Sequence, residues 1–428
     1  MNSYSSQQSM GRKVNMSSIL LFLIFFFSSM MVIQIDEKSI FMWLEVVFLI
    51  HVILMKKKIL RVKAPHLNAI YISLLITCLF SLVSSISVNY KRASIRNTIT
   101  FLLSYVIIAY INNLNLDRAI VVYKRLGKAI IMMCNLQCMW CIIQFLLYRL
   151  YLVDINNWIF HESLGMLDIA SAYKFGELLP SGLTWHPGVM APIIAIAFFL
   201  NTSIAWKYIA LLAGVLTGNA TCLIATAICI GFELIIFLLD KKVSRKKFVI
   251  LIFLIILVVI LSIVTGFYNT IYDSITYVVQ RIFGITDTNS TNAHIMYFTE
   301  YPNIVRHSSF LQVMFGYGKG ASGYPFSILY YFQTYAKSWS VECDVMDILV
   351  SRGIVGFGIY YIFLIENMLK GRKVNIKYLF LQLTILLEGI TYQVQYDWVF
   401  LIEALLFCMI KDGYDIFLGR LKEEKLIG

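Results

Sequence analysis

Residues 248–267 read FVILIFLIILVVILSIVTGF, twenty consecutive residues without a charged side chain. An α-helix needs about 20 apolar residues to cross the hydrocarbon core of a bilayer. The whole 428-residue chain has this character, with 59% hydrophobic and 14% charged residues, whereas a soluble domain has roughly 25% charged residues. The composition therefore excludes an ordinary soluble globular protein and indicates a membrane protein.

Eleven further apolar segments accompany this one, and none shows the two-residue alternation over about ten residues that marks a strand of a membrane β-barrel. We predict an all-α, polytopic helical membrane protein with about 12 transmembrane helices, in which residues 1–428 form a single membrane domain. The pair Gly218-Asn219 is typical of either a turn or a helix kink, so eleven to thirteen spans are compatible with the sequence. The twelve segments are residues 17–35, 39–55, 67–88, 97–111, 129–152, 188–203, 205–217, 219–239, 248–267, 345–365, 377–393 and 398–411.

The distribution of basic residues predicts the orientation of the chain. Of the 36 Lys and Arg residues, 25 fall in alternate connections and near the two chain ends. Cytoplasmic connections carry an excess of Lys and Arg, so we expect these connections and both termini in the cytoplasm. The segment 17–35 has no small-residue cleavage site, which indicates a retained first span and not a signal peptide. Orientation on a membrane also accounts for the net charge of +12, so we expect no nucleic acid partner.

Two connections are much longer than the others. Residues 153–187 and residues 268–343 are 35 and 76 residues long, and the predicted orientation places both on the external, periplasmic side. Connections of this length are usually functional. Charged residues inside the predicted spans are functional candidates as well, but they do not recur in two halves of the chain, which argues against the inverted repeats of a secondary transporter. They are Glu45, Glu233, Arg352, Glu388 and Glu403.

Cysteines give no sign of a disulfide framework or a cofactor. Seven of the eight lie in apolar segments. Cys134, Cys138 and Cys141 have the spacing of an iron–sulfur ligand run, but they fall inside a predicted helix, where small residues serve helix packing. We therefore expect no cofactor.

The first long connection ends in PSGLTWHPG, residues 180–188, directly before a predicted span. Within it, His186 is held in a stiff Trp-His-Pro-Gly turn. A histidine titrates near neutral pH and can act as a general base on a polar headgroup. Alternatively, the histidine and its neighbouring indole are interfacial anchors, and Pro187 begins the next helix.

The second long connection carries basic residues suited to a diphosphate. Guanidinium groups bind phosphate oxygens in a bidentate manner. The alternative for each residue is solvated surface charge. The candidates are Arg281, His294, Arg306 and Lys319. Lys319 lies in Gly316-Tyr-Gly-Lys-Gly320, which lacks the Lys-Ser/Thr ending of a P-loop and predicts a tight turn instead.

Acidic residues follow at the end of the same connection. Glu342 and Asp344 precede a predicted span, where carboxylates also complement the positive end of a helix. Their spacing resembles the metal-binding acid pair of nucleotide-sugar transferases, but the predicted orientation places them opposite the cytoplasmic sugar nucleotides, so we predict no metal site. A carboxylate near a lipid surface can instead take a proton from a sugar hydroxyl.

With these loops placed, the chain resembles the O-antigen polymerase family and, more distantly, the O-antigen ligases. The span count, the cytoplasmic termini and the large external loop between the ninth and tenth spans match that architecture over essentially the full length. The local similarities are SGLTWHP at 181–187, NAHIMYF at 292–298, LQVMFGYG at 311–318, and VECDVMDIL at 341–349 followed by Gly353-Ile-Val-Gly356.

This resemblance implies a metal-independent membrane glycosyltransferase at the periplasmic face of a bacterial inner membrane. It would join undecaprenyl-diphosphate-linked oligosaccharide repeats, with membrane lipid and a chain-length regulator protein as further partners. The resemblance then implies Glu342 first and His186 second as the base. Diphosphate and sugar binding would fall to Arg281, His294, Arg306, Lys319 and Asp344.

Three other functions stay open at this stage. A ligase would use the same donor with an outer-core lipid acceptor. A peptidoglycan polymerase would use a lipid-linked disaccharide peptide. A flippase for lipid-linked oligosaccharides has a similar span count but short external loops, so the 76-residue connection argues against it.

Overall fold

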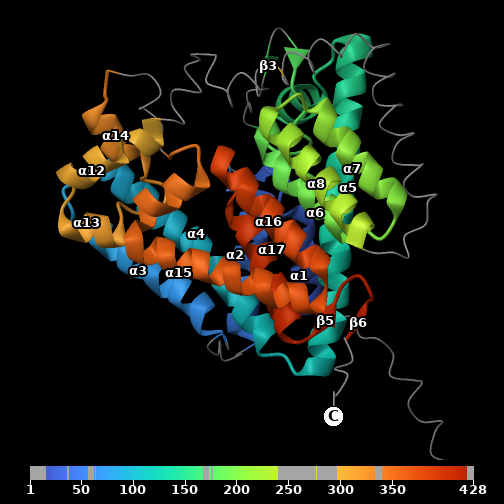
Figure 1. The fold of residues 1–428 in the computed structure, drawn as a ribbon, viewed down its shortest axis with the longest axis horizontal. Coiled ribbons are helices and arrows are strands. Elements are labelled where there is room, and N and C mark those ends of the chain that lie inside the picture. The colour runs from blue at the N-terminus through green and yellow to red at the C-terminus, as the bar shows by residue number, and fades with distance from the viewer. Residues whose placement is uncertain are drawn as a thin grey trace, which may run out of the picture.

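The computed structural model describes residues 16–35, 38–55, 62, 64–166, 173–174, 177–239, 276, 296–332 and 340–421. This part of the chain is mostly helical, with few strands (Figure 1). The helices of the first half are α1 Met16–Phe27, α2 Ile40–Leu54, α3 Pro65–Val83, α4 Val88–Asn112, α5 Leu116–Tyr151, α6 Met190–Leu200, α7 Ile204–Leu216 and α8 Ala220–Leu239. Those of the second half are α12 Tyr301–His307, α13 Phe310–Phe315, α14 Gly323–Leu329, α15 Asp344–Val374, α16 Ile376–Thr391 and α17 Asp397–Lys411.

Short elements occupy the connections. A π-helix spans Asn157–Ser163, and a 3-10 helix at Pro187–Val189 leads into α6. Three two-stranded antiparallel hairpins complete the described elements. They are β1 Gln34–Ile35 with β2 Lys38–Ser39, β3 Tyr173–Lys174 with β4 Glu177–Leu178, and β5 Tyr414–Asp415 with β6 Arg420–Leu421.

Eleven of the twelve predicted apolar segments contain a helix, and the twelfth, residues 248–267, lies outside the described residues. In the segment 17–35 the helix ends at Phe27, and residues 34–35 belong to strand β1. Among the described residues, α3, α4, α5 and α15 are long and apolar enough to cross a membrane, and several shorter apolar helices accompany them. The turn at Gly218, with φ of 61°, separates α7 from α8 and settles that position as a turn.

Two helices begin well before their predicted apolar segments. Helix α4 starts at Val88 and α5 at Leu116, so polar residues continue each helix beyond its apolar part. At the start of α5, the side chain of Asn115 accepts a hydrogen bond from the backbone N–H of Arg118 at 3.3 Å. This cap satisfies a donor that the first helical turn leaves unpaired.

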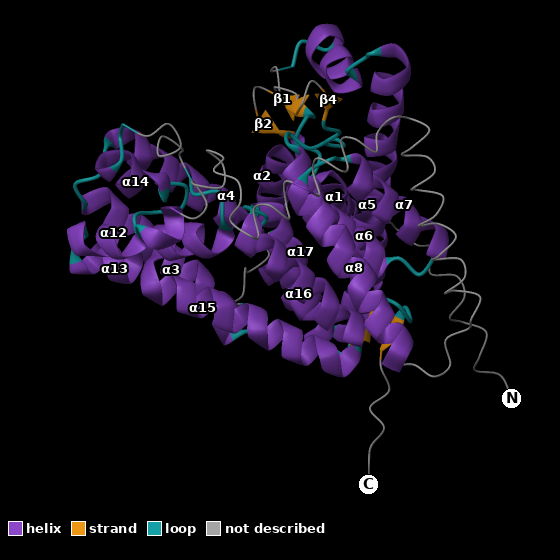
Figure 2. Ribbon diagram, turned by 45° about the horizontal axis from the view of Figure 1, so that its top comes forward, coloured by secondary structure: helices purple, strands orange, loops and turns teal. Residues whose placement is uncertain are grey.

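The centre of the molecule is formed by α6 and α17. Every residue of α6 is buried, and so is α17 from Trp398 to Ile410. Helix α6 packs against α5, α7, α8 and α16, whereas α17 packs against α4 and α15; Figure 2 shows α6 beside α5, α7 and α8. A helix that is apolar on all sides belongs in the interior of a bundle.

A second, smaller group lies beside this body. Helices α12, α13 and α14 stack next to α3, α4 and the beginning of α15 (Figure 1). Their own apolar cluster includes Tyr297, Ile304, Phe326 and Met346. Because this group covers the starts of α4 and α15, it positions the polar residues described next.

Candidate functional site

A cavity of about 710 Å³ opens where the first turns of α4 meet the chain after α13. Arg92 and Arg96 lie four residues apart on α4, so they share one helix face. Both are exposed, and neither has an ion-pair partner among the described residues. Two guanidinium groups of this kind suit a phosphate or diphosphate ligand. The lining residues are Asn89, Arg92, Ala93, Arg96, Asn97, Gly320 and Ser340.

One wall of the cavity is the tight turn that the glycine-rich segment predicts. Gly316, Gly318 and Gly320 have φ values of 80°, 110° and 77°, a region that glycine adopts without strain. A Cβ atom on Gly318 would collide with the Ser94 hydroxyl, and one on Gly320 with the Asn97 amide. The turn therefore approaches α4 as closely as it does because it lacks side chains there.

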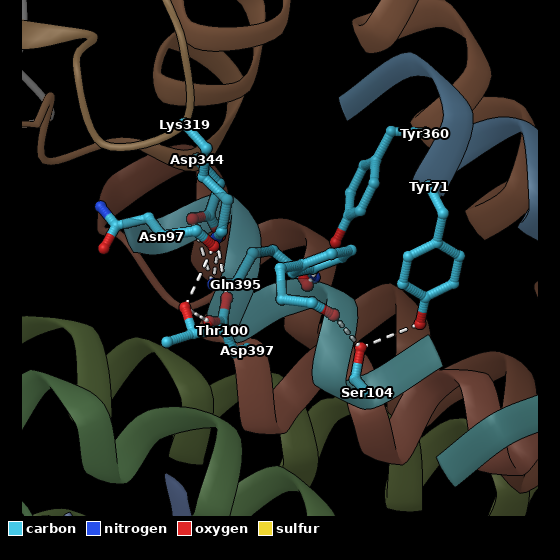
Figure 3. Close-up of polar contacts among 10 residues, drawn as sticks. Tyr71, Asn97, Thr100, Ser104, Lys319, Asp344, Tyr360, Gln395 and Asp397 are labelled. Carbon is cyan, nitrogen blue, oxygen red and sulfur yellow. Dashed lines mark hydrogen bonds and ion pairs between the residues drawn. The ribbon is translucent and has the colours of Figure 1, made fainter. Parts of the chain in front are cut away.

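Lys319, within this turn, is paired. Its Nζ lies 2.7 Å from Oδ1 of Asp397 at the start of α17, and 5.0 Å from the centre of the Phe101 ring. Oδ2 of Asp397 accepts from the Thr100 hydroxyl at 3.4 Å. Figure 3 shows Thr100, Lys319 and Asp397 converging from three different elements. The positive charge of Lys319, which the sequence predicts to bind a diphosphate, is thus balanced by the carboxylate of Asp397.

A second cation lies deeper. Arg352, on α15, is only 5% exposed, and its guanidinium faces the rings of Tyr360 at 4.8 Å and Phe101 at 5.4 Å. Its Nη1 has no hydrogen-bond partner among the described residues. Lys319 and Arg352 therefore bring two positive charges to the same aromatic ring near the cavity.

Residues 392–396, which connect α16 to α17, and Asp397 at the start of α17 contact most of the polar groups. Both carboxylate oxygens of Asp344 accept from the backbone N–H groups of Val394 and Gln395 at 3.1 Å. The Gln395 side chain accepts from the Tyr360 hydroxyl at 2.5 Å and donates to Glu403 at 3.1 Å. Asp344, predicted to bind substrate, here holds the backbone of this connecting segment (Figure 3).

His186 packs against the same segment. Its Nδ1 accepts from the Gly188 backbone N–H at 3.1 Å and from the Tyr392 hydroxyl at 2.9 Å, and its ring stacks on that of Tyr392. Burial lowers the pKa of His186 to about 4, so the imidazole is neutral at pH 7. Because Nδ1 accepts both bonds, these contacts assign the proton to Nε2. His186 is arranged to donate a hydrogen bond more readily than to take a proton.

Glu342 is exposed at the end of the second long connection. The negative charge of Glu342 interacts electrostatically with the Tyr392 phenol. Ser340, two residues earlier, lines the cavity and donates a hydrogen bond to Gln393 at 3.4 Å. Tyr392 thus contacts His186 and lies within electrostatic reach of Glu342.

The remaining predicted residues are not part of this arrangement. Arg306 is exposed on α12 and does not line the cavity. Arg281 and His294 lie outside the described residues.

Sequence reasoning missed Arg92, Arg96 and residues 392–397. The sequence contains a signal for the two arginines. They lie four residues apart directly before an apolar run, and this spacing predicts one basic helix face. A signal for the third is the polar and aromatic sequence YQVQYD between two apolar runs.

No protein-family model matches this chain, and no curated protein matches it significantly.

Proposed function

We propose that this protein is an O-antigen polymerase, a membrane glycosyltransferase that joins undecaprenyl-diphosphate-linked oligosaccharide repeats into a surface polysaccharide. The observation that carries the proposal is the cavity lined by Arg92 and Arg96, with the exposed carboxylate of Glu342 two residues from its wall at Ser340. A cationic cavity beside a carboxylate offers the two functions that this transfer needs, stabilisation of a departing diphosphate and acceptance of a proton.

The transfer would proceed either as a single displacement or as two successive displacements. The bonds formed and broken overall are the same in both cases. A hydroxyl oxygen of the acceptor sugar forms a bond to the anomeric carbon of the donor. The bond from that carbon to the diphosphate oxygen breaks, and its electron pair leaves with the lipid diphosphate. Arg92 and Arg96 would stabilise that charge, and Glu342 would take the hydroxyl proton. His186, neutral and donating from Nε2, would orient a sugar or phosphate oxygen.

The proposal includes the topology of about 12 spans in a bacterial inner membrane, with both termini in the cytoplasm and residues 153–187 and 268–343 outside. The polar site supports this topology, because it is formed by the end of α16 and the starts of α4, α15 and α17. The distribution of basic residues predicts that all four of these helix ends are external. Reporter fusions after Ser290 should report the periplasm and fusions after Lys373 the cytoplasm. A cytoplasmic signal from Ser290 would contradict the proposal.

The residue test compares arginines of the cavity with one outside it. R92K and R96K keep the charge but lose bidentate geometry, so we expect shorter polysaccharide chains from each. E342Q should lower chain extension by roughly 100-fold or more. R118K changes an exposed arginine in the first turn of α5, close to the end of α4 that lies away from the cavity, and should leave chain length unchanged. Normal chain length in R92K, R96K and E342Q would remove the cavity from the mechanism.

A deletion strain separates the function classes. Loss of a polymerase should leave lipopolysaccharide capped with a single repeat, whereas loss of a ligase should leave bare core and polymer on the lipid carrier. Loss of a flippase should strand single repeats on the cytoplasmic leaflet. We expect the single-repeat product on a gel.

A further inference from the structure

Helix α13 carries large apolar side chains that the described protein leaves uncovered. Phe310 is 75% exposed and Leu311 45% exposed. Two basic residues, Arg306 and His307, directly precede them at the end of α12 and are exposed as well. Apolar side chains next to basic ones are typical of a segment that lies at a membrane interface.

The attachment of α13 indicates what covers this face. Phe315, at the end of α13, stacks on Phe80 of α3 with ring centres 4.7 Å apart. Helix α3 is long and apolar enough to cross a membrane, and next to Phe80 it exposes Leu79, Leu82 and Val83. In Figure 1, α13 lies beside α3 and α15. The exposed apolar surface of a membrane-spanning helix thus continues onto α13.

The segment is also held in a defined shape. The Ser309 hydroxyl accepts from the Gln312 backbone N–H at 3.3 Å, and the Gln312 side chain accepts from the Ser309 backbone N–H at 2.8 Å. This capping box satisfies donors at the beginning of the helix. Phe310 is therefore presented outward by a capped helix that is packed against α3 and α15.

We infer that α13 is seated in the outer leaflet of the membrane, with Phe310 and Leu311 among the acyl chains and Arg306 and His307 at the lipid phosphates. The turn after α13 continues to Gly320 in the cavity wall, so this seating places the cavity at the level of the lipid headgroups. The inference does not depend on the proposed glycosyl transfer.

The test uses a nitroxide probe at F310C in the full-length protein, reconstituted in vesicles of phosphatidylethanolamine and phosphatidylglycerol. Seven of the eight native cysteines are buried and Cys78 is partly buried, so C78S is the background. L79C serves as the lipid-facing control, and S163C, in the exposed π-helix, as the water-facing control.

We expect F310C to collide often with dissolved oxygen and rarely with a water-soluble nickel complex, as L79C does. Collision with the nickel complex at the level of S163C would place α13 in water and overturn the inference. Shielding from both reagents would mean that protein covers this face, as in a second copy or a partner, and would overturn it equally. L311C carries the same test where F310C does not fold.

Discussion

Lys319 and Asp397 form an ion pair, with Nζ 2.7 Å from Oδ1, that joins the glycine-rich turn after α13 to the first residue of α17. The two side chains are 16% and 29% exposed, so their charges are partly withdrawn from water. An anionic ligand could attract Lys319 only by competing with Asp397, whereas Arg92 and Arg96 have no such competitor among the described residues.

Removing one partner of this pair should cost more than removing both. K319M leaves the partly buried carboxylate of Asp397 without its cation, and we expect a loss of about 1–3 kcal/mol in stability. The double variant K319M/D397L should be less destabilised than K319M. Thermal unfolding of the purified protein in detergent measures both. Unchanged stability in K319M, combined with loss of polysaccharide, would favour a direct role of Lys319 at the diphosphate.

The backbone packed against the turn at Gly316 leaves no room for a side chain there. In G316A, the new Cβ would collide with the backbone of Ser351 at a φ of 80°, and we expect a loss of roughly 2 kcal/mol or more. G358A is the matched control, because a Cβ there meets nothing within 4 Å and alanine favours the helix. Equal melting temperatures for G316A and G358A would show that the turn adjusts without strain.

His186 should make stability depend on pH. Burial lowers its pKa from 6.5 to about 4, so between these values the unfolded chain binds a proton that the folded chain does not. Stability is therefore complete above about pH 6.5 and falls as the pH drops toward 4. We expect H186Q to show a smaller fall in melting temperature over this range than the unchanged protein. Identical slopes would mean that His186 titrates normally in the folded state.

The Tyr392 hydroxyl should contribute to the position of His186. Y392F removes the donor to Nδ1 and retains the stacked ring, so we expect a loss of about 1 kcal/mol. The histidine pKa should move measurably in nuclear magnetic resonance of the labelled imidazole. Y330F, which changes a hydroxyl bonded to Asn303 and Glu300, is a control that should leave the His186 signal in place. A His186 signal that does not change in Y392F would place the two side chains apart in solution.

The apolar segments alone predict the helices, because a long apolar run in lipid can satisfy its backbone polar groups only by forming a helix. Residues 129–152 and 345–365 illustrate this, since α5 and α15 cover nearly all of them and are long and apolar enough to cross a membrane. The glycine-rich segment also predicts the turn at Gly316–Gly320, because glycine adopts the positive φ values of a tight turn without strain.

Which polar residues contact one another depends on how distant helices pack. Lys319 was predicted to hold a ligand but is paired with Asp397, 78 residues later in the chain. The sequence predicts only that Arg92 and Arg96 lie on the external side. In the structure they line the cavity together with Gly320 and Ser340. Residue type sets what a side chain can bind, but packing between distant helices sets which partner is within reach and which charges remain available to a ligand.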